Sequence, residues 1–327
     1  LPIYQPIEST VVKLIESLKR RNVLQKVSLA AYEEAEGKQP EGYTEQLLAA
    51  ITSVPDDFSL QPITDDLESL LNATYKTPGL RWRLHCLNSS IGSLRKGDFG
   101  FVFARPETGK TTFLTSEVSN FISQTTGDVL WIVNEEQPTK VMLRVIQSYF
   151  GITVDQAYGN IQHYRKLFKE QTGGRFKLYD STASNKNSVE ALCKKHLPAL
   201  IVFDQIDKIQ GFKAADREDL LLGAIYQWAR DLAKRYAPVI GVTQADGSGE
   251  GVRWLTMANV ANAKTAKQAE ADWILGIGAI PDSGWESVRF FNISKNKLLG
   301  DTDSNPELRH GKLTAIIEPT IARYRDV

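Results

Sequence analysis

Residues 104–111, Ala-Arg-Pro-Glu-Thr-Gly-Lys-Thr, have the residue types that bind a phosphate group. They nearly match the P-loop pattern, which is a glycine, four further residues and then Gly-Lys-Ser/Thr. Gly109, Lys110 and Thr111 fit this pattern, but Ala104 stands where the first glycine is expected. Backbone N–H groups of such a loop and of the following helix bind the β-phosphate. We expect Lys110 to reach the β- and γ-phosphates and Thr111 to hold Mg²⁺.

The flanking residues support this interpretation. Residues 99–103, Phe-Gly-Phe-Val-Phe, form a short apolar run that is typical of a buried strand. Residues 112–122 carry apolar side chains at helical spacing. A strand, a loop and a helix in this order are the context that the motif requires. The flanks therefore favour a nucleotide site over an ordinary helix that happens to begin with lysine and threonine.

Three further apolar runs end in polar residues that could act on a nucleotide. The runs are 129–133, 199–203 and 238–243. Ligands bind at the carboxyl ends of parallel strands, so these ends are expected to meet. Asp204 follows the second run and could hold Mg²⁺. Glu135 or Glu136 could orient the attacking water, and Gln244 could sense the γ-phosphate. The alternatives are two solvated glutamates and an amide that is satisfied by its own loop.

Two polar segments between these runs could contact single-stranded nucleic acid. The candidate DNA-binding residues are Lys208, Lys213 and Arg217 in the first segment, and Gly247, Gly249 and Arg253 in the second. Cationic side chains and adaptable backbone N–H groups suit a single-stranded phosphate backbone. Solvated surface loops are the alternative. A late strand also carries two lysines on one face, Lys295 and Lys297, which repel each other unless an anion lies opposite. The triphosphate of a neighbouring subunit could be that anion, and a solvated edge is the alternative.

Composition limits the class of protein. The 327 residues are 42% hydrophobic and 24% charged, with a formal net charge of zero. A nucleic-acid surface must therefore be local and not a global basic field. The two cysteines, Cys86 and Cys193, have no metal-ligand spacing, which fits a reducing compartment such as the cytoplasm. No apolar run approaches the roughly 18 residues of a membrane span, so no membrane partner is expected.

The pattern of elements predicts an α/β fold with a small all-helical region before it. Residues 1–79 are expected to be helical, with helices at 11–33, 43–51 and 63–75, and residues 80–327 to form the main domain. Expected strands lie at 99–104, 129–134, 200–204, 238–243, 273–278 and 288–294, and expected helices at 111–124, 138–150, 186–196 and 218–236. Strands that alternate with helices indicate a mostly parallel sheet covered by helices.

Residues 84–327 resemble the hexameric replicative DNA helicases of the DnaB type, including the helicase half of the phage primase-helicases. The most specific part is Ala104-Arg-Pro-Glu-Thr-Gly-Lys-Thr-Thr-Phe, because alanine followed by Arg-Pro is common at this point in that family. The stretch from Glu135 to Arg144 also matches and assigns the catalytic role to Glu135. The segment from Trp254 to Asp272 resembles the family segment that follows the second DNA loop.

The resemblance implies a RecA-like P-loop NTPase core that binds ATP, or another NTP or dNTP, with Mg²⁺. Its nucleotide-binding residues would be Ala104, Arg105, Pro106, Glu107, Thr108, Gly109, Lys110, Thr111 and Thr112, with Asp204 on the metal and Gln244 as the γ-phosphate switch. It further implies a ring, usually of six subunits, that moves 5′ to 3′ on single-stranded DNA. Primase and polymerase are implied partners, and residues 11–33 would dock on a neighbouring subunit.

One position departs from the family pattern. These helicases carry Lys-X-Arg on the late strand, and the arginine acts in the neighbour's site, but this chain has Lys295-Asn-Lys297. Lysine lacks the planar bidentate fork of arginine. Lys297 could still serve as the catalytic cation, or Arg289 or Arg309 could take that role. Two alternative functions stay open. One is a RecA-like recombinase that forms filaments, and the other is a non-motor accessory protein of phage replication whose assembly is switched by nucleotide binding.

Overall fold

The computed structural model describes residues 21–22, 24–52, 66–72, 78–180, 185–212, 217–262, 264–298 and 300–327. The chain divides into two compact units, Leu1–Asp66 and Leu67–Val327. The boundary expected between residues 79 and 80 comes from Pro78-Gly79 and from the change in the pattern of elements there, and it stays a prediction.

The described part of the first unit consists of helices joined by a turn at residues 36–42. Residues 21–22 and 24–35 are helical, and α2 spans Tyr43–Thr52, close to the expected 43–51. The Glu34 carboxylate accepts hydrogen bonds from the backbone N–H groups of Gly42 and Thr44, at 2.6 and 2.8 Å, and so holds the start of α2. Residues 11–20 and residue 23 of the expected first helix lie outside the described residues.

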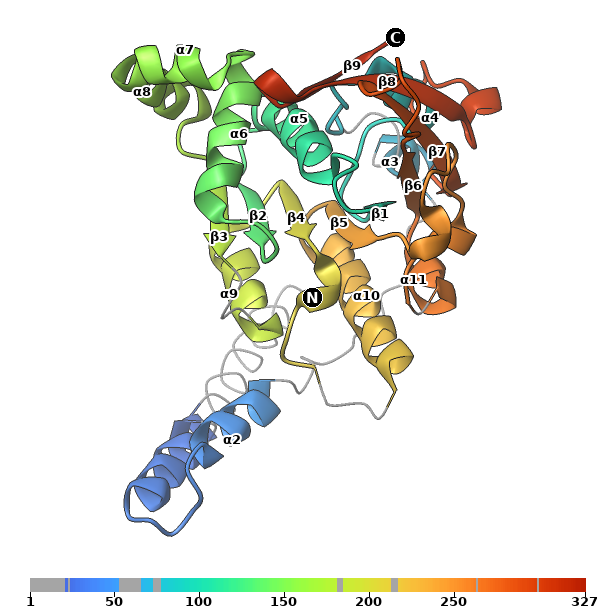
Figure 1. Ribbon diagram of the computed structural model, residues 1–327. Helices are drawn as coiled ribbons and strands as arrows, with labels where there is room; N and C mark the ends of the chain where they lie inside the picture. Colours follow the sequence, from blue (N-terminus) through green and yellow to red (C-terminus); the bar gives the residue numbers. More distant parts are fainter. Residues whose placement is uncertain are drawn as a thin grey trace, which may run out of the picture. The chain divides into compact units, whose positions relative to one another are not determined.

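The second unit contains nine described strands in one sheet, in the order β3-β2-β4-β5-β1-β6-β7-β8-β9 (Figure 1). The strands are β1 (Phe99–Ala104), β2 (Val129–Val133), β3 (Phe176–Asp180), β4 (Leu200–Asp204), β5 (Val239–Gln244), β6 (Trp273–Gly278), β7 (Val288–Asn296), β8 (Lys312–Glu318) and β9 (Arg323–Asp326). Strands β3 to β6 in this order are parallel, and β7 to β9 add antiparallel pairs. The expected α/β class with a mostly parallel sheet is confirmed.

Helices cover both faces of this sheet. The described helices of the second unit are α3 (Leu67–Leu71), α4 (His85–Ser90), α5 (Lys110–Ile122), α6 (Pro138–Phe150), α7 (Val154–Gly159), α8 (Ile161–Thr172), α9 (Lys186–His196), α10 (Glu218–Arg235) and α11 (Lys264–Glu270). The bounds expected for α6 and α9 are confirmed. Of the helix expected at 63–75, only 67–71 is described as an α-helix, and residues 63–65 and 73–75 lie outside the described residues.

The alternation of side chains along β1 divides the core into two layers. Val102 and Ala104 lie in the apolar layer that includes Phe113 of α5, while Phe101 and Phe103 lie in the layer that includes Tyr226 of α10. Strand side chains alternate between the faces of a sheet, so one apolar run supplies both layers. Figure 1 shows α5 and α6 on one face and α9 and α10 on the other.

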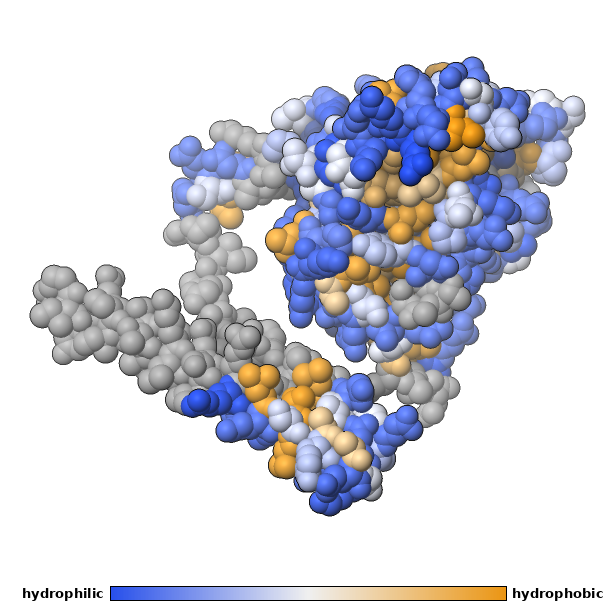
Figure 2. Space-filling model, turned by 90° about the vertical axis from the view of Figure 1, so that its left-hand side faces the viewer, coloured by the Kyte–Doolittle hydropathy of each residue, from blue (hydrophilic) through white to orange (hydrophobic). Residues whose placement is uncertain are grey.

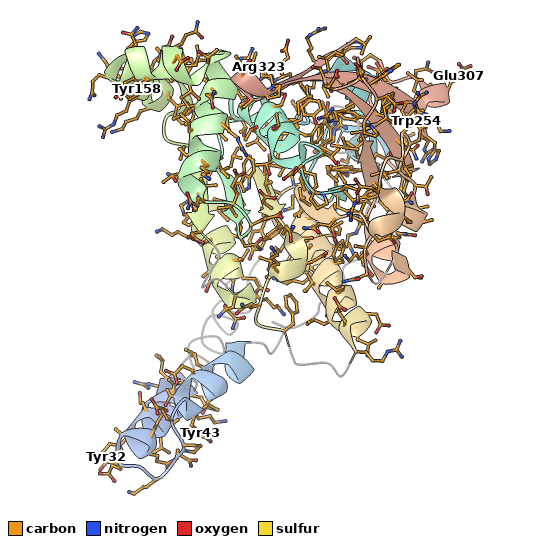
Figure 3. The ribbon with its side chains drawn as sticks, in the orientation of Figure 1. Tyr32, Tyr43, Tyr158, Trp254, Glu307 and Arg323 are labelled. Carbon is orange, nitrogen blue, oxygen red and sulfur yellow. The ribbon has the colours of Figure 1, made fainter. Side chains whose placement is uncertain are left out.

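The elements that sequence reasoning missed carry weak local signals. The β3 and β9 edge strands and β8 contain charged residues and are only partly buried, so they lack an apolar run. The short helix α7 did carry a signal, because Thr153 and Gln156 form a capping box at its start. At the outer edge, Arg323 of β9 donates hydrogen bonds to the carbonyl oxygens of Ser148 and Tyr149, which attaches this strand to α6 (Figure 3).

Candidate functional site

The loop between β1 and α5 has the backbone that a phosphate-binding loop needs. Gly109 precedes α5 with φ of 106°, a conformation that favours glycine. A Cβ there would lie 2.6 Å from Cδ1 of Ile317 and 2.8 Å from the hydroxyl of Tyr324, so a larger residue would clash. The first N–H groups of α5 point toward this loop and have no carbonyl partner within the helix. The segment can therefore receive an anion at a helix N-terminus.

Lys110 lies across this loop. Its ammonium donates to the carbonyl oxygens of Ala104 and Arg105, at 3.2 and 3.1 Å. The side chain is only 8% exposed, and this burial lowers its pKa, while the nearby Glu135 and Asp204 carboxylates act in the opposite direction. The loop carbonyls thus hold the cation next to the predicted phosphate position.

Asp204 at the end of β4 is the most buried carboxylate of the site. It is 1% exposed, and burial followed by repulsion from Glu135 and Glu136 raises its pKa to about 7. Within the described residues, its Oδ2 atom has no hydrogen-bond partner. Buried oxygen atoms of this kind need a compensating partner. A divalent cation supplies such a partner, so the donor atoms present fit Mg²⁺.

Two neighbouring amides share this unsatisfied character. In the described part of the chain, Oδ1 of Asn134 and Nε2 of Gln205 are buried without partners, and Asn134 donates to the Gln205 carbonyl at 2.9 Å. Gln205 has φ of 64°, which is strained for a residue other than glycine. Strain and unpaired polar atoms that cluster beside Asp204 are typical of a functional site. Sequence reasoning missed both amides.

The structure separates the two adjacent glutamates. Glu135 is exposed, and its Oε1 atom accepts a hydrogen bond of 3.4 Å from Nε2 of Gln244. Glu136 instead forms a 2.6 Å ion pair with Arg144 on α6. Gln244 pairs in register with Ala104 of the loop. The ends of β2, β4, β5 and β1 are consecutive in the sheet, and this order brings the predicted residues together.

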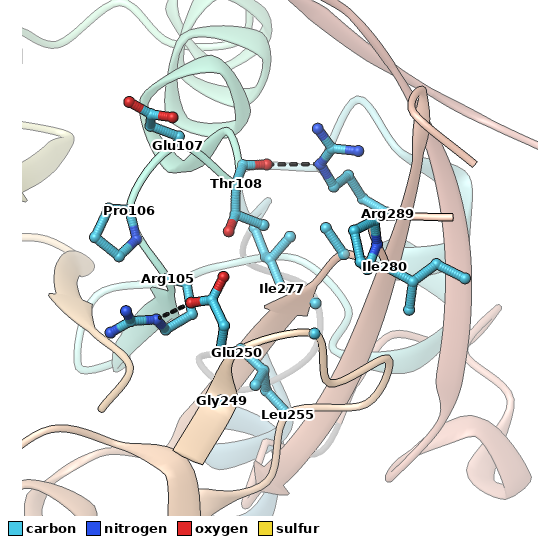
Figure 4. A pocket seen from close by; sticks show the side chains of 14 residues that line it. Arg105, Pro106, Glu107, Thr108, Gly249, Glu250, Leu255, Ile277, Ile280 and Arg289 are labelled. Carbon is cyan, nitrogen blue, oxygen red and sulfur yellow. Dashed lines mark hydrogen bonds and ion pairs between the residues drawn. The ribbon is translucent and has the colours of Figure 1, made fainter. Parts of the chain in front are cut away.

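A pocket of about 360 Å³ lies beside the loop (Figure 4). Its walls are residues 105–108, 249–251 and 277–281, with Leu255 and Arg289. Arg105 forms a 2.8 Å ion pair with Glu250, and Arg289 donates to the carbonyl of Thr108 at 2.7 Å. Arg289 therefore lies on the loop of its own chain. No local pattern of residues points to Glu250 or to the pocket.

The first predicted DNA-binding segment is only partly described. Lys208 is exposed at the end of η2 (Ile206–Lys208), four residues beyond β4. Lys213 lies outside the described residues. Arg217 forms an exposed 2.7 Å ion pair with Asp219 at the start of α10.

The second segment is ordered against the sheet. Gly247 and Gly249 form η3 (Gly247–Gly249), and a Cβ on Gly249 would lie 2.9 Å from Leu255. The guanidinium of Arg253 lies 5.0 Å from the ring centre of Phe290 and 5.4 Å from that of Trp285. Cation–π contacts therefore hold Arg253, although its side chain is exposed.

The two late lysines lie at the other edge of the sheet. The backbone N–H of Lys297 donates to the carbonyl of Asp272, which precedes β6, whereas the phosphate-binding loop follows the carboxyl end of the parallel neighbour β1. Burial, then Lys297 and Arg230, lowers the pKa of Lys295 to about 8, and its ammonium donates to the Gln268 carbonyl. Lys297 is exposed. These lysines cannot reach the loop of their own chain.

Arg309 lies close to this lysine pair. Its Nε atom donates to the carbonyl of Asn296 at 2.9 Å, and Asn296 separates the two lysines in the sequence. Of the two arginines considered from the sequence, Arg309 is therefore at the edge where Lys297 lies, and Arg289 is beside the phosphate-binding loop.

Comparison with known proteins gives the family of this chain. Residues 66–246, more than half of the chain, match the AAA domain family, so the chain belongs to this family. Membership implies a P-loop NTPase domain that binds nucleotide. No protein among the curated sequences matches the chain. No helix of the described residues is long and apolar enough to cross a membrane.

Solved structures share the fold. A DnaB-like replicative helicase that interacts with primase has a TM-score of 0.66 and 15% identity, over 98% of this chain and 78% of that one. The ATPase domain of G40P has a TM-score of 0.63 and 15% identity, over 88% of this chain and all of that one. The fold that the sequence resemblance implied is confirmed.

Proposed function

We propose that this protein is a Mg²⁺-dependent ATPase that works as a ring-shaped replicative DNA helicase and moves 5′ to 3′ on single-stranded DNA in the cytoplasm. The observation that carries the proposal is the meeting of Lys110, Glu135, Asp204 and Gln244 at the ends of adjacent strands. A cation, a carboxylate, a metal-binding carboxylate and an amide are the groups that phosphoryl transfer requires.

Each group has a separate role in the proposed hydrolysis. Lys110 binds the β- and γ-phosphates, and the loop N–H groups orient them. Thr111 and Asp204 would hold Mg²⁺, which neutralises phosphate charge when it is bound. The Glu135 carboxylate orients the attacking water and accepts its proton. The Gln244 amide donates to the γ-phosphate, so the loss of this phosphate removes a hydrogen bond at the end of β5.

Placement of Lys295 and Lys297 supports assembly. They lie at the sheet edge opposite the phosphate-binding loop, so they act on a triphosphate only if it belongs to another copy. We propose a homo-hexamer with nucleotide between subunits. Lys208, Lys213, Arg217 and the segment 245–253 would contact the DNA backbone. Because a structurally similar helicase interacts with primase, we propose primase as a partner, with polymerase as a second.

Two apolar faces give this assembly its proposed contacts. In the first unit, Leu24, Leu29 and Tyr32 are each 58% exposed on one helix. In the second unit, a groove of about 350 Å³ between α6, α7 and α8 is lined mainly by Leu143, Ile146, Val154, Tyr158, Ile161 and Phe168. Figure 2 looks onto this side, where apolar residues gather among hydrophilic ones, and Figure 3 shows Tyr158 on α7.

We propose that the exposed helix of a second copy occupies this groove. Exposed apolar patches rimmed by polar residues mark interaction sites, and here both partners occur in one sequence. Arg165 in the groove lining and Lys169 on α8 place positive charge beside the groove, while Glu33 and Glu36 place negative charge on and beside the helix. Glu36 already pairs with Lys38 of its own chain at 2.7 Å, so the match of the two apolar surfaces carries this part of the proposal.

An ATPase assay with and without single-stranded DNA tests the function, and mass photometry of the same sample counts subunits. We expect turnover that DNA stimulates and a mass of six chains when nucleotide is present. If single-stranded DNA does not stimulate ATP turnover, the proposed motor function is contradicted. Open filaments in electron micrographs would support a RecA-like recombinase instead.

A nucleotide-switched accessory protein is the second candidate. The observation that favours it is Lys297, because a lysine replaces the expected planar cation of the motor enzymes. Such a protein would change its assembly state on nucleotide binding without DNA-dependent turnover. The same pair of measurements separates it from the helicase.

A further inference from the structure

A fully buried lysine lies behind the proposed nucleotide site. Lys267 of α11 is 0% exposed. Its ammonium donates to Oδ2 of Asp207 at 2.7 Å, to the carbonyl of Ala261 at 2.9 Å and to Oγ1 of Thr243 at 3.1 Å. These bonds use all three donors of the ammonium. Removal of a charged group from water is unfavourable, so an apolar residue would fill this place at lower cost.

The three acceptors belong to the three segments that the proposed motor must move together. Thr243 directly precedes Gln244, the proposed γ-phosphate sensor. Asp207 lies in η2, between Asp204 and the first DNA segment. Ala261 follows the second DNA segment, and its backbone N–H donates to the Gln244 carbonyl at 3.0 Å. One side chain therefore connects the end of β5, which carries Gln244, to residues that flank both DNA-binding segments.

Further hydrogen bonds close the network. Asp207 accepts from the Thr243 hydroxyl at 2.6 Å and from the Tyr226 hydroxyl at 3.0 Å. The ammonium also lies 5.5 Å from the ring centre of Tyr226. Burial, and then Asp207, raises the pKa of Tyr226 well above its usual value, so its hydroxyl stays a donor. A shift of the end of β5 relative to η2 would break several of these bonds at once.

We propose that Lys267 is a positioning residue that transmits the state of Gln244 to both DNA-binding segments. This inference rests on the proposed DNA-stimulated ATPase. Loss of the γ-phosphate moves the end of β5, and Lys267 carries that movement to Asp207 and Ala261. DNA bound to the segments acts on Gln244 through the same contacts, because coupling is reciprocal.

The test compares turnover with and without oligo-dT in the full chain. Lys267→Met keeps a flexible stem of similar size and removes the charge. We expect the ratio of turnover with DNA to turnover without DNA to fall at least fivefold, while basal turnover and the KM for ATP stay within twofold. Thr243→Val keeps the shape of the side chain but removes the hydroxyl that accepts from Lys267 and donates to Asp207, and it is expected to lower the ratio in the same direction.

Asn88→Leu is the matched control. Asn88 is also buried and makes three hydrogen bonds, to the backbone of Trp82 and Leu84, but it lies in the α4 region and not beside the DNA segments. The control is expected to lower the melting temperature and leave the ratio unchanged. If Asn88→Leu lowers the DNA-stimulation ratio as much as Lys267→Met does, the inference is overturned, because the lower ratio would then result from reduced stability of the fold.

The outcomes separate the two proposals. If DNA does not stimulate the unmodified protein, the proposed function fails. If it does, and Lys267→Met keeps a ratio within twofold of that protein, the positioning role fails. Should Lys267→Met not fold, an unchanged ratio in Thr243→Val overturns the inference, and a lowered ratio supports it.

Discussion

Gln244 donates a 3.4 Å hydrogen bond from Nε2 to Oε1 of Glu135, and this contact joins the ends of β5 and β2. The two residues are 109 positions apart in the sequence. The bond places the proposed sensor against the proposed catalytic carboxylate, so a change at one is felt by the other without an intermediate residue. It also distinguishes Glu135 from Glu136, which faces Arg144.

Glu135→Gln is expected to lower ATP turnover by about 10²- to 10⁴-fold, because the amide cannot accept a proton from water. Nucleotide affinity, measured with a fluorescent ATP analogue, should stay within a few-fold. Glu136→Gln is the matched control and is expected to keep turnover within about threefold. A larger loss in Glu136→Gln than in Glu135→Gln would reverse the assignment.

Metal binding is expected to depend on pH through Asp204. Its pKa is raised to about 7, mainly by burial, so at pH 6 the carboxyl is mostly protonated and must release a proton to hold a cation. The affinity for Mg²⁺·ADP should therefore rise as pH increases from about 6 to 7 and level off above it. Calorimetry in buffers of different ionisation enthalpy should show proton release at pH 6.5, and Asp204→Asn should abolish it. No proton release in the unmodified protein would contradict the role.

Glu117 in α5 should make stability fall with rising pH. Burial raises its pKa from 4.5 to about 7, so between these values the native state holds a proton that the unfolded state has lost. The free energy of unfolding then decreases as pH rises through this window, and below 4.5 the effect is absent. Asp98 and Asp204 act in the same direction. Urea unfolding of Glu117→Gln at pH 5 and pH 8 should show a smaller difference than the unmodified chain; an equal difference would contradict the prediction.

Lys297→Ala is expected to lower DNA-stimulated turnover by about tenfold or more, because trans-acting cations contribute strongly to phosphoryl transfer. Lys297→Arg should retain or increase turnover. Rings mixed from Lys297→Ala and Glu135→Gln chains should regain part of the activity, since a Lys297→Ala subunit supplies Glu135 and its neighbour supplies Lys297. Unchanged turnover in Lys297→Ala would contradict this role of Lys297 and favour Arg309 as the trans-acting cation.

Leu29→Asp should dissociate the ring, because it places a charge on the apolar helix face. We propose that this face occupies the groove between α6, α7 and α8 of a second copy. Leu29 is 58% exposed, so the change should leave the fold stable. Mass photometry is expected to show chains of one or two copies, and circular dichroism an unchanged melting curve. Lys38→Asp, at an exposed position in the turn after this helix, is the control and should keep the full mass.

Local patterns of residues predict several parts of this protein. Apolar runs gave the central strands, and a glycine with lysine and threonine after β1 gave the phosphate-binding loop. Asp204 and Gln244 were found because a polar residue after a buried strand must lie at the edge of the sheet. These signals depend on neighbours in the chain, so the sequence alone carries them.

The remaining features of the site depend on the packing of distant segments. In the sequence, Lys267 resembles an ordinary helix lysine. The fold buries it against Asp207, which lies 60 residues earlier in the chain. The different partners of Glu135 and Glu136, and the ion pair of Arg105 with Glu250, are likewise set by contacts between distant segments. Burial and long-range pairing depend on the packing of the whole sheet, and no local pattern of residues records them.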